Sequence, residues 1–310
     1  MATQLRAPVC RALSLDARLA SALDKAPMTG PVHSVFRRVL NVLAADRLVA
    51  LSSEGLDDAP WSVRTDVADW RRLGVEVGAV VVLDSGHIAV EGAPGIALDL
   101  RHCQKWHATV SSAAAVATDL LARRTAALEG LLDARGVPGG VVPPRADASP
   151  IEAELGRRLR AGCERLTQAV RANDDGAASL AARSLLGLGP GLTPAGDDFM
   201  VGLALVAAVP GSRLVAVGRA IRAVLDACPD HTTLVSRATL EEAVAGRARE
   251  SLLGILNRVF AAPHGDDARF AEHLRTPVDR VLSIGHTSGT DILSGLVAGL
   301  RLENELRGSM

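Results

Sequence analysis

Two hydrophobic patterns divide the chain. Between residues 30 and 101, apolar residues occur in short β-branched runs, among them GAVVVLDSG and HIAVEG, which glycine, aspartate, serine and proline separate. Such runs and breaks are typical of strands joined by turns. The segment DSGHIAVEG predicts a hairpin whose turn is formed by Asp84, Ser85 and Gly86. We therefore predict a small antiparallel β barrel or sandwich over this region.

The pattern changes to a helical one after RHCQKWH, residues 101–107. In the segment that begins at Ser111, leucines recur at helical spacing with arginine and glutamate between them, and similar segments follow to the end of the chain. The segment ARLASALDKA, residues 17–26, predicts one short helix before the strands. Residues 136–150, GVPGGVVPPRADASP, break the helical pattern and are the best candidate for a linker, although they need not separate domains. The predicted fold class is α+β, with an N-terminal mostly-β domain, 1–105, and an α-helical domain, 106–310.

Composition narrows the class of protein. The 310 residues include three tryptophans, four phenylalanines and no tyrosine, so the core must be largely aliphatic. A net charge of −1 gives no reason to expect nucleic acid or an anionic membrane as a partner. The four cysteines lie far apart without a CxxC pair, which favours free thiols in a reducing compartment. The N-terminal residues lack the apolar stretch of a signal peptide, so we expect a cytoplasmic protein.

The segment GLGPGLTPAGDDF, residues 187–199, interrupts two helical patterns. A helix is expected to end near Leu186, with Gly187 as its C-cap, and a strongly apolar helix to begin near Asp197. A glycine-rich loop before a helix N-terminus presents unpaired N–H groups and a partial positive charge, which together favour anion binding. The alternative is an ordinary helix–helix turn in which Asp197 or Asp198 caps the second helix.

Two further segments repeat this chemistry. SIGHTSGTDILSG, residues 283–295, and PDHTTLVSRATL, residues 229–240, each place small hydroxyl residues at a predicted helix start. If the three segments converge, they form a pocket rich in N–H and O–H donors with carboxylates nearby; the alternative is that each segment is an ordinary cap. His33 and Ser34 begin a predicted strand, where they face either a cleft or an edge of the sheet.

Two common functional motifs are absent from the sequence. No lysine followed by serine or threonine ends the glycine-rich loop, so it is not a phosphate-binding loop of the Walker type, and no GxSxG elbow occurs. Asp197, Asp198 and Asp291 could bind Mg²⁺, but their spacing matches no established ligand pattern. We therefore assign no metal-ligating residue and leave Mg²⁺ as a possible cofactor.

The segments GLGPGLTPAGDDFMVG, TTLVSRATLEEAVAG and GHTSGTDILSG, with VHSVF near the N-terminus, resemble the hallmark segments of the AllH-like proteins. The resemblance extends from about residue 31 to about residue 300. It implies a subunit associated with oxamate carbamoyltransferase, an activity of anaerobic allantoin breakdown that interconverts oxalurate and phosphate with oxamate and carbamoyl phosphate. It also implies partner subunits, one of which resembles acyl-CoA synthetases. The resemblance does not identify any catalytic residue in this chain.

Three functions remain open on the sequence. The first is a carbamoyltransferase subunit that binds small carboxylate or phosphate anions and stabilises charge on the transferred carbonyl group. The second is a non-catalytic subunit that binds a ligand or holds partners together, and a stand-alone phosphotransferase is a weaker third. In the first hypothesis, the candidate catalytic residues are Asp198, His286 and Asp291. The candidate anion-binding residues are His33, Ser34, Gly189, Gly191, Leu192, Thr193, Gly196, Asp197, Thr232, Thr233, Ser236, Thr287, Ser288 and Gly289.

Overall fold

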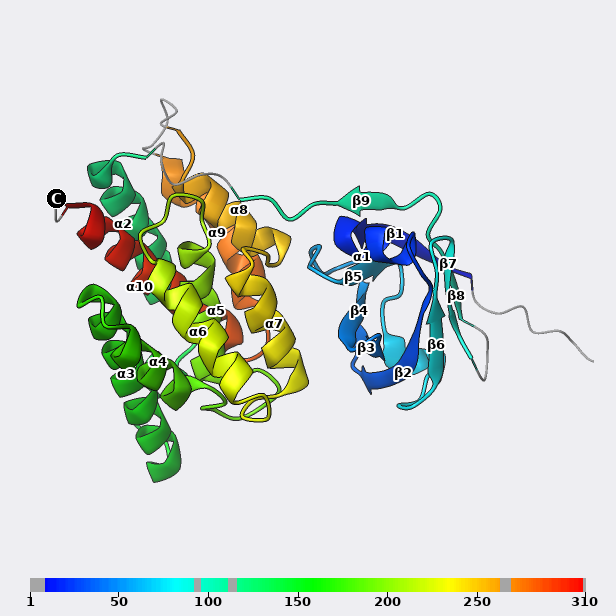
Figure 1. The fold of residues 1–310 in the computed structure, drawn as a ribbon, viewed down its shortest axis with the longest axis horizontal. Helices are drawn as coiled ribbons and strands as arrows, with labels where there is room; N and C mark the ends of the chain where they lie inside the picture. Colours follow the sequence, from blue (N-terminus) through cyan, green and yellow to red (C-terminus); the bar gives the residue numbers. More distant parts are fainter. Residues whose placement is uncertain (1–8, 92–95, 111–115, 263–268, 309–310) are drawn as a thin grey trace, which may run out of the picture. The chain divides into compact units, whose positions relative to one another are not determined.

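The protein is described here by a computed structural model covering residues 9–91, 96–110, 116–262 and 269–308. The chain forms two compact units, Met1–Ala108 and Thr109–Met310 (Figure 1). The first is built mainly of strands and the second of helices, which confirms the predicted α+β class.

Strands of the N-terminal unit close into a ring. They are β1 (Val9–Asp16), β2 (Met28–Val35), β3 (Val39–Ala44), β4 (Arg47–Ser53), β5 (Ser62–Thr65), β6 (Val80–Leu83), β7 (His87–Val90), β8 (Ala97–Asp99) and β9 (Gln104–Trp106). The strand order in the sheet is β5-β4-β3-β2-β6-β7-β8-β1-β9, and an additional pairing of β5 with β1 closes eight of these strands on themselves. The hairpin predicted around Asp84 is confirmed, because β6 and β7 pair antiparallel and the Asp84 N–H donates to the His87 carbonyl at 2.9 Å.

The sheet is mixed, so the prediction of an antiparallel sheet is wrong in part. β1 pairs parallel with both β8 and β9, and β4 pairs parallel with β5. β1 also lies before the region in which strands were expected. Its register shifts between Ala12 and Ser14, which breaks the alternation by which a strand is recognised in a sequence. The predicted short helix is confirmed as α1 (Ala17–Leu23), and Asp16 caps it through the Arg18 N–H.

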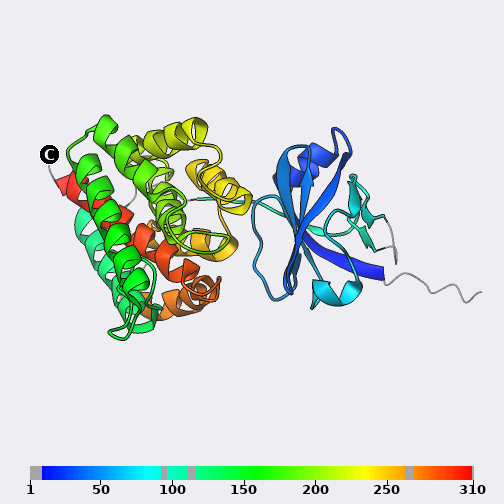
Figure 2. The ribbon, with the colours of Figure 1, turned by 90° about the horizontal axis from the view of Figure 1, so that it is seen from below.

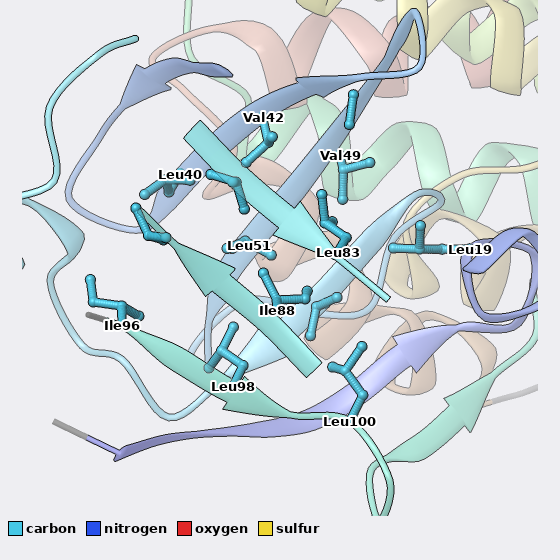
Figure 3. Close-up of a cluster of buried hydrophobic side chains, with 14 of the residues drawn as sticks. Leu19, Leu40, Val42, Val49, Leu51, Leu83, Ile88, Ile96, Leu98 and Leu100 are labelled. Carbon is cyan, nitrogen blue, oxygen red and sulfur yellow. The ribbon is translucent and has the colours of Figure 1, made fainter. Parts of the chain in front are cut away.

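Aliphatic side chains fill the interior of this unit. Figure 3 shows Leu40, Leu51, Leu83, Ile88 and Leu98 pointing toward one another from different strands, and each is at most 1% exposed. The one-turn 3-10 helix η1 (Trp70–Leu73) adds the fully buried Trp70. An aliphatic core follows from a sequence with few aromatic residues.

The C-terminal unit is helical throughout its described elements (Figure 2). The helices are α2 (Thr118–Arg135), α3 (Pro150–Arg171), α4 (Asp175–Leu185), α5 (Ala195–Ala207), α6 (Val215–Ala227), α7 (Leu234–Val244), α8 (Glu250–Val259), α9 (Phe270–Leu282) and α10 (Ser288–Gly308). The segment predicted as a linker falls between α2 and α3, inside this unit. All four cysteines are free, as the sequence predicts.

Helices α5 and α10 pack backbone against backbone at the centre of this unit. A Cβ atom placed on Gly202 of α5 would lie 2.0 Å from the carbonyl oxygen of Ile292. A Cβ atom on Gly295 of α10 would lie 2.0 Å from the carbonyl oxygen of Phe199. Only glycine permits this approach, and it fixes the starts of the two helices with respect to each other.

Candidate functional site

The glycine-rich loop between α4 and α5 has the backbone that its sequence predicts. Gly187, Gly189 and Gly191 have φ angles of 73°, 135° and 94°, in the region that side chains other than glycine rarely adopt. A Cβ atom on Gly187 would lie 1.9 Å from the carbonyl oxygen of His231, so the loop packs directly against the chain that leads into α7. Gly187 follows the end of α4, which confirms its predicted place after that helix.

The start of α5 lies earlier than predicted. The helix begins at Ala195, with Pro194 at the N-cap and no side-chain cap, so neither Asp197 nor Asp198 is the capping residue. The Gly196 N–H instead donates to the Leu188 carbonyl at 2.9 Å, and proline at the N-cap needs no N–H partner. Both aspartates therefore lie within the first turns of the helix, where each is almost fully buried.

Asp197 joins the glycine-rich loop to α7. Its Oδ1 atom accepts from the Gly187 N–H at 2.8 Å, and its Oδ2 atom accepts from the Ser236 hydroxyl at 2.7 Å and from the Thr232 hydroxyl. Burial raises the pKa of Asp197, and these three donors oppose the rise. A hydroxyl group has one hydrogen to donate, so Thr232 and Ser236 give theirs to Asp197.

Two further hydroxyl contacts connect the three segments. Thr233 caps α7 by accepting from the Ser236 N–H at 3.1 Å, and its own hydroxyl donates to the Leu192 carbonyl. The hydroxyl oxygens of Thr193 and Ser288 lie 2.9 Å apart, which joins the loop to the first residue of α10. The structure therefore brings residues 187–198, 232–236 and 287–291 together at one junction.

Asp198 lies at this junction with an unsatisfied oxygen. Its side chain is 3% exposed, and its Oδ2 atom is buried without a hydrogen-bond partner in the described part of the chain. Burial raises the pKa of Asp198 to about 8, the negative charge of Asp291 adds to the rise, and hydrogen bonds from the Ser288 and Thr193 hydroxyls oppose it.

Asp291, in the first turn of α10, resembles Asp198. It is fully buried, and its Oδ1 atom accepts from the Val141 N–H at 2.7 Å, while its Oδ2 atom has no partner among the described residues. Burial raises the pKa of Asp291 to about 6, although the Val141 N–H and the Thr287 hydroxyl oppose the change. A Cβ atom on Gly140 would lie 2.2 Å from Oδ1, so only glycine fits beside this carboxylate.

The segment after α2 is also part of the junction, a role that its sequence did not predict. The Val137 N–H donates to the Thr290 hydroxyl oxygen at 2.9 Å, and the Val141 N–H donates to Asp291 as described above. A Cβ atom on Gly139 would lie 3.7 Å from a methyl carbon of Thr287. The available signal was the adjacent pair Gly139 and Gly140 directly after a predicted helix, because such a pair permits close backbone approach.

Three candidate residues lie apart from these hydrogen bonds. His286 is exposed in the turn before α10, and none of the junction's hydrogen bonds described above involves its side chain. His33 and Ser34 belong to strand β2 of the N-terminal unit, where the His33 Nδ1 atom lies 3.2 Å from the Ser34 hydroxyl oxygen. Asn41 of β3 also donates to that oxygen, at 3.0 Å. Both side chains therefore have hydrogen-bond contacts within the N-terminal unit.

Gly196 and Gly289 serve packing at the two helix starts. A Cβ atom on Gly196 would lie 2.2 Å from the carbonyl oxygen of Leu185, and one on Gly289 would lie 2.0 Å from the carbonyl oxygen of Val281. Each glycine therefore lets a helix start approach the end of a preceding helix. Within the described ranges, no group of three or more His, Cys, Asp or Glu side chains could hold a metal ion.

These observations define an α+β chain of two units, in which glycine- and hydroxyl-bearing turns of the helical unit surround buried aspartates. Residues 11–105 match the family described as the AllH family N-terminal domain, and residues 185–300 match the family described as oxamate carbamoyltransferase subunit AllH. The chain belongs to the AllH family, which confirms the resemblance seen in its sequence. No solved structure was found to match it. None of the helices that the structure describes is long and apolar enough to cross a bilayer.

Proposed function

We propose that this chain is a subunit of an oxamate carbamoyltransferase-type enzyme and binds a small carboxylate or phosphate anion at the junction of its glycine-rich loop with α7 and α10. One observation carries the proposal. Three segments that lie far apart in the sequence are joined by hydrogen bonds, and three N–H groups of the loop beside them have no partner among the described residues.

The donors for an anion are the N–H groups of the loop. In the part of the chain that the structure describes, the N–H groups of Gly189, Gly191 and Leu192 donate to no other residue. Gly191 and Leu192 are exposed, and a Cβ atom on Gly191 would contact nothing within 4 Å. The loop leads into the N-terminus of α5, whose partial positive charge favours an anion.

The family name supports a carbamoyl group as the transferred unit. In that reaction the bond between the ureido carbonyl carbon and the amide nitrogen of oxalurate breaks, a bond between that carbon and a phosphate oxygen forms, and the oxamate nitrogen takes up a proton. Loop N–H groups and the Thr193 hydroxyl would stabilise charge on the carbonyl oxygen. His286, exposed beside Thr287, would transfer the proton.

Asp198, Asp291 and the remaining hydroxyl residues would form the polar wall of the site. Thr232, Thr233, Ser236 and Asp197 hold the loop in shape rather than contact the anion, because their hydrogen bonds are made to one another and to the loop. Partner subunits, one of them similar to acyl-CoA synthetases, would complete the enzyme.

A non-catalytic, ligand-binding subunit is the second candidate. It is favoured by the exposed position of His286, for which no orienting hydrogen bond is found among the described residues. Both candidates require anion binding. Only the first requires that a change at His286 lower turnover in the assembled enzyme.

Calorimetry on the full chain tests anion binding directly. The chain is titrated with inorganic phosphate and with oxamate, first as the natural sequence and then as Thr193→Val, which keeps the shape of the side chain and removes its hydroxyl. Loss of one hydrogen bond of about 1 kcal/mol predicts an affinity about fivefold lower. Thr239→Val is the matched control, because the Thr239 hydroxyl bonds only within α7, to the Val235 carbonyl.

An absence of binding by the natural chain, or an equal loss of affinity in both variants, would contradict the proposal. The two candidate functions are then separated with the partner subunits present. His286→Asn should lower kcat for carbamoyl phosphate formation by roughly 10²-fold if His286 transfers the proton, and should leave kcat unchanged if the chain is non-catalytic.

A further inference from the structure

The starts of α5 and α10 hold two carboxylates on facing sides of the helices. Asp198 lies four residues before Gly202, and Asp291 lies four residues before Gly295. Residues four apart lie on one face of a helix, and the two glycines are the points at which α5 and α10 touch. Each aspartate is therefore one turn from the contact and on the side that faces the other helix.

Other contacts place the two carboxylates near each other. The hydroxyl oxygens of Thr193 and Ser288, 2.9 Å apart, span the space between the two helix starts, and both hydroxyls are close enough to Asp198 to oppose the rise of its pKa. Asp291 is close enough for its negative charge to act on Asp198.

Among the described residues, no basic side chain pairs with either carboxylate. Within the described ranges, no ion pair involves Asp198 or Asp291. Burial, rather than any nearby cation, is the main influence on the pKa of each aspartate. Two buried carboxylates without a counter-charge are strongly unfavourable. Each also keeps one buried oxygen, Oδ2, without a hydrogen-bond partner. A single proton could satisfy one such oxygen, whereas a cation between the carboxylates satisfies both.

We propose that Asp198 and Asp291 bind one Mg²⁺ ion between the N-terminal turns of α5 and α10. The two carboxylates and the Thr193 and Ser288 hydroxyls offer oxygen, which is the ligand atom that Mg²⁺ prefers. Mg²⁺ commonly uses one or two protein carboxylates and completes its shell with water and with ligand oxygens. Further oxygens would come from the hydroxyls of Thr193 and Ser288. An anion bound to the loop would supply others.

This inference goes beyond the proposed function, because the ion needs no anion in order to bind. Its test therefore omits phosphate and oxamate. The full chain is freed of metals with EDTA, dialysed, and titrated calorimetrically with MgCl₂, and with MnCl₂ as a probe visible by electron paramagnetic resonance. We expect one ion for each chain, and we expect Asp198→Asn and Asp291→Asn each to lower its affinity at least about tenfold.

Asp133→Asn is the control, because Asp133 is exposed on α2 and takes part in none of the hydrogen bonds described for the junction. Asparagine keeps the shape of aspartate and removes a buried charge, so the test variants should fold; circular dichroism checks this. A second readout is thermal unfolding, in which Mg²⁺ should raise the midpoint of the natural chain and not that of Asp198→Asn.

The proposal is overturned if the folded natural chain binds neither ion, or if both site variants bind as tightly as the control. Phosphate calorimetry in EDTA keeps the two proposals separate. Phosphate binding without any Mg²⁺ binding would remove the cation and leave the anion site, and the reverse result would remove the anion site and leave the cation.

Discussion

Gly202 and Gly295 form a direct backbone contact between α5 and α10, and neither position has room for a methyl group. The carbonyl oxygens that a Cβ atom would meet belong to helical backbone, which cannot move without displacing a whole helix. The spacing between the two helices, and with it the position of the aspartates at their starts, therefore depends on these glycines.

Gly295→Ala should consequently destabilise the protein by about 1–3 kcal/mol, the usual cost of overfilling a packed interior. Urea unfolding followed by circular dichroism measures this. Gly218→Ala is the matched control, since Gly218 lies inside α6 with nothing within 4 Å of its Cβ position. That change should stabilise the helix by about 0.5–1 kcal/mol. Equal effects of the two changes would show that α5 and α10 are not in contact.

Asp197→Asn tests the carboxylate that joins the loop to α7. The Asp197 carboxylate accepts from Gly187, Thr232 and Ser236. An amide keeps one acceptor oxygen and turns an N–H group toward a donor, so we expect a loss of about 1–3 kcal/mol in unfolding free energy. The same urea measurement applies, with exposed Asp133→Asn as the control. An unchanged midpoint would mean that the three donors have other partners in solution.

The helix and strand classes follow from the sequence because they depend on local periodicity. The aliphatic runs of β3, β4, β6 and β7 and the helical spacing of α2 are visible without any tertiary information. The bulged strand β1 and the parallel pairings are not, because they depend on which strand lies beside which. The start of α5 was misplaced because its cap is a proline rather than an aspartate.

Part of the junction was also predictable. Segments with glycine, hydroxyl and carboxylate residues before helices were recognisable, and they do lie together. The pairing of each donor was not predictable: a sequence does not show that Thr232 donates to Asp197 rather than to a ligand. Nor does it show that Val141 reaches Asp291, since the segment resembles a linker and its role arises from the packing of α2 on α10.

The stability of the metal-free chain should fall as pH rises from about 4 to about 8. The Asp198 carboxyl has an ordinary pKa of 3.8, and burial raises it to about 8 in the folded chain. Between these values the folded state holds a proton that the unfolded state releases, so a higher pH favours unfolding. Asp291, whose pKa is raised to about 6, adds to the fall in the lower part of this range.

Unfolding midpoints in urea with EDTA, at about pH 5 and about pH 8, measure the effect. Asp198→Asn removes the titrating group and should make the difference between the two midpoints smaller. A natural chain that becomes more stable over this interval, or a variant with an undiminished difference, would argue against a buried, proton-binding Asp198 in the metal-free protein.

Gly140→Ala should disrupt the Asp291 carboxylate specifically, because the new Cβ atom would lie 2.2 Å from Oδ1 and 2.3 Å from Oδ2. To make room, Asp291 must turn away from the Val141 N–H, which leaves a donor unpaired at a cost of about 1–3 kcal/mol. Gly130→Ala is the control, since Gly130 lies inside α2 with nothing within 4 Å. A double-mutant cycle separates this overlap from a general effect on the segment. In an Asp291→Ala background the overlap no longer exists, so Gly140→Ala should cost at least about 1 kcal/mol less there than in the natural chain. If the cost is the same in both backgrounds, the segment after α2 does not pack against Asp291, and the junction consists of three segments rather than four.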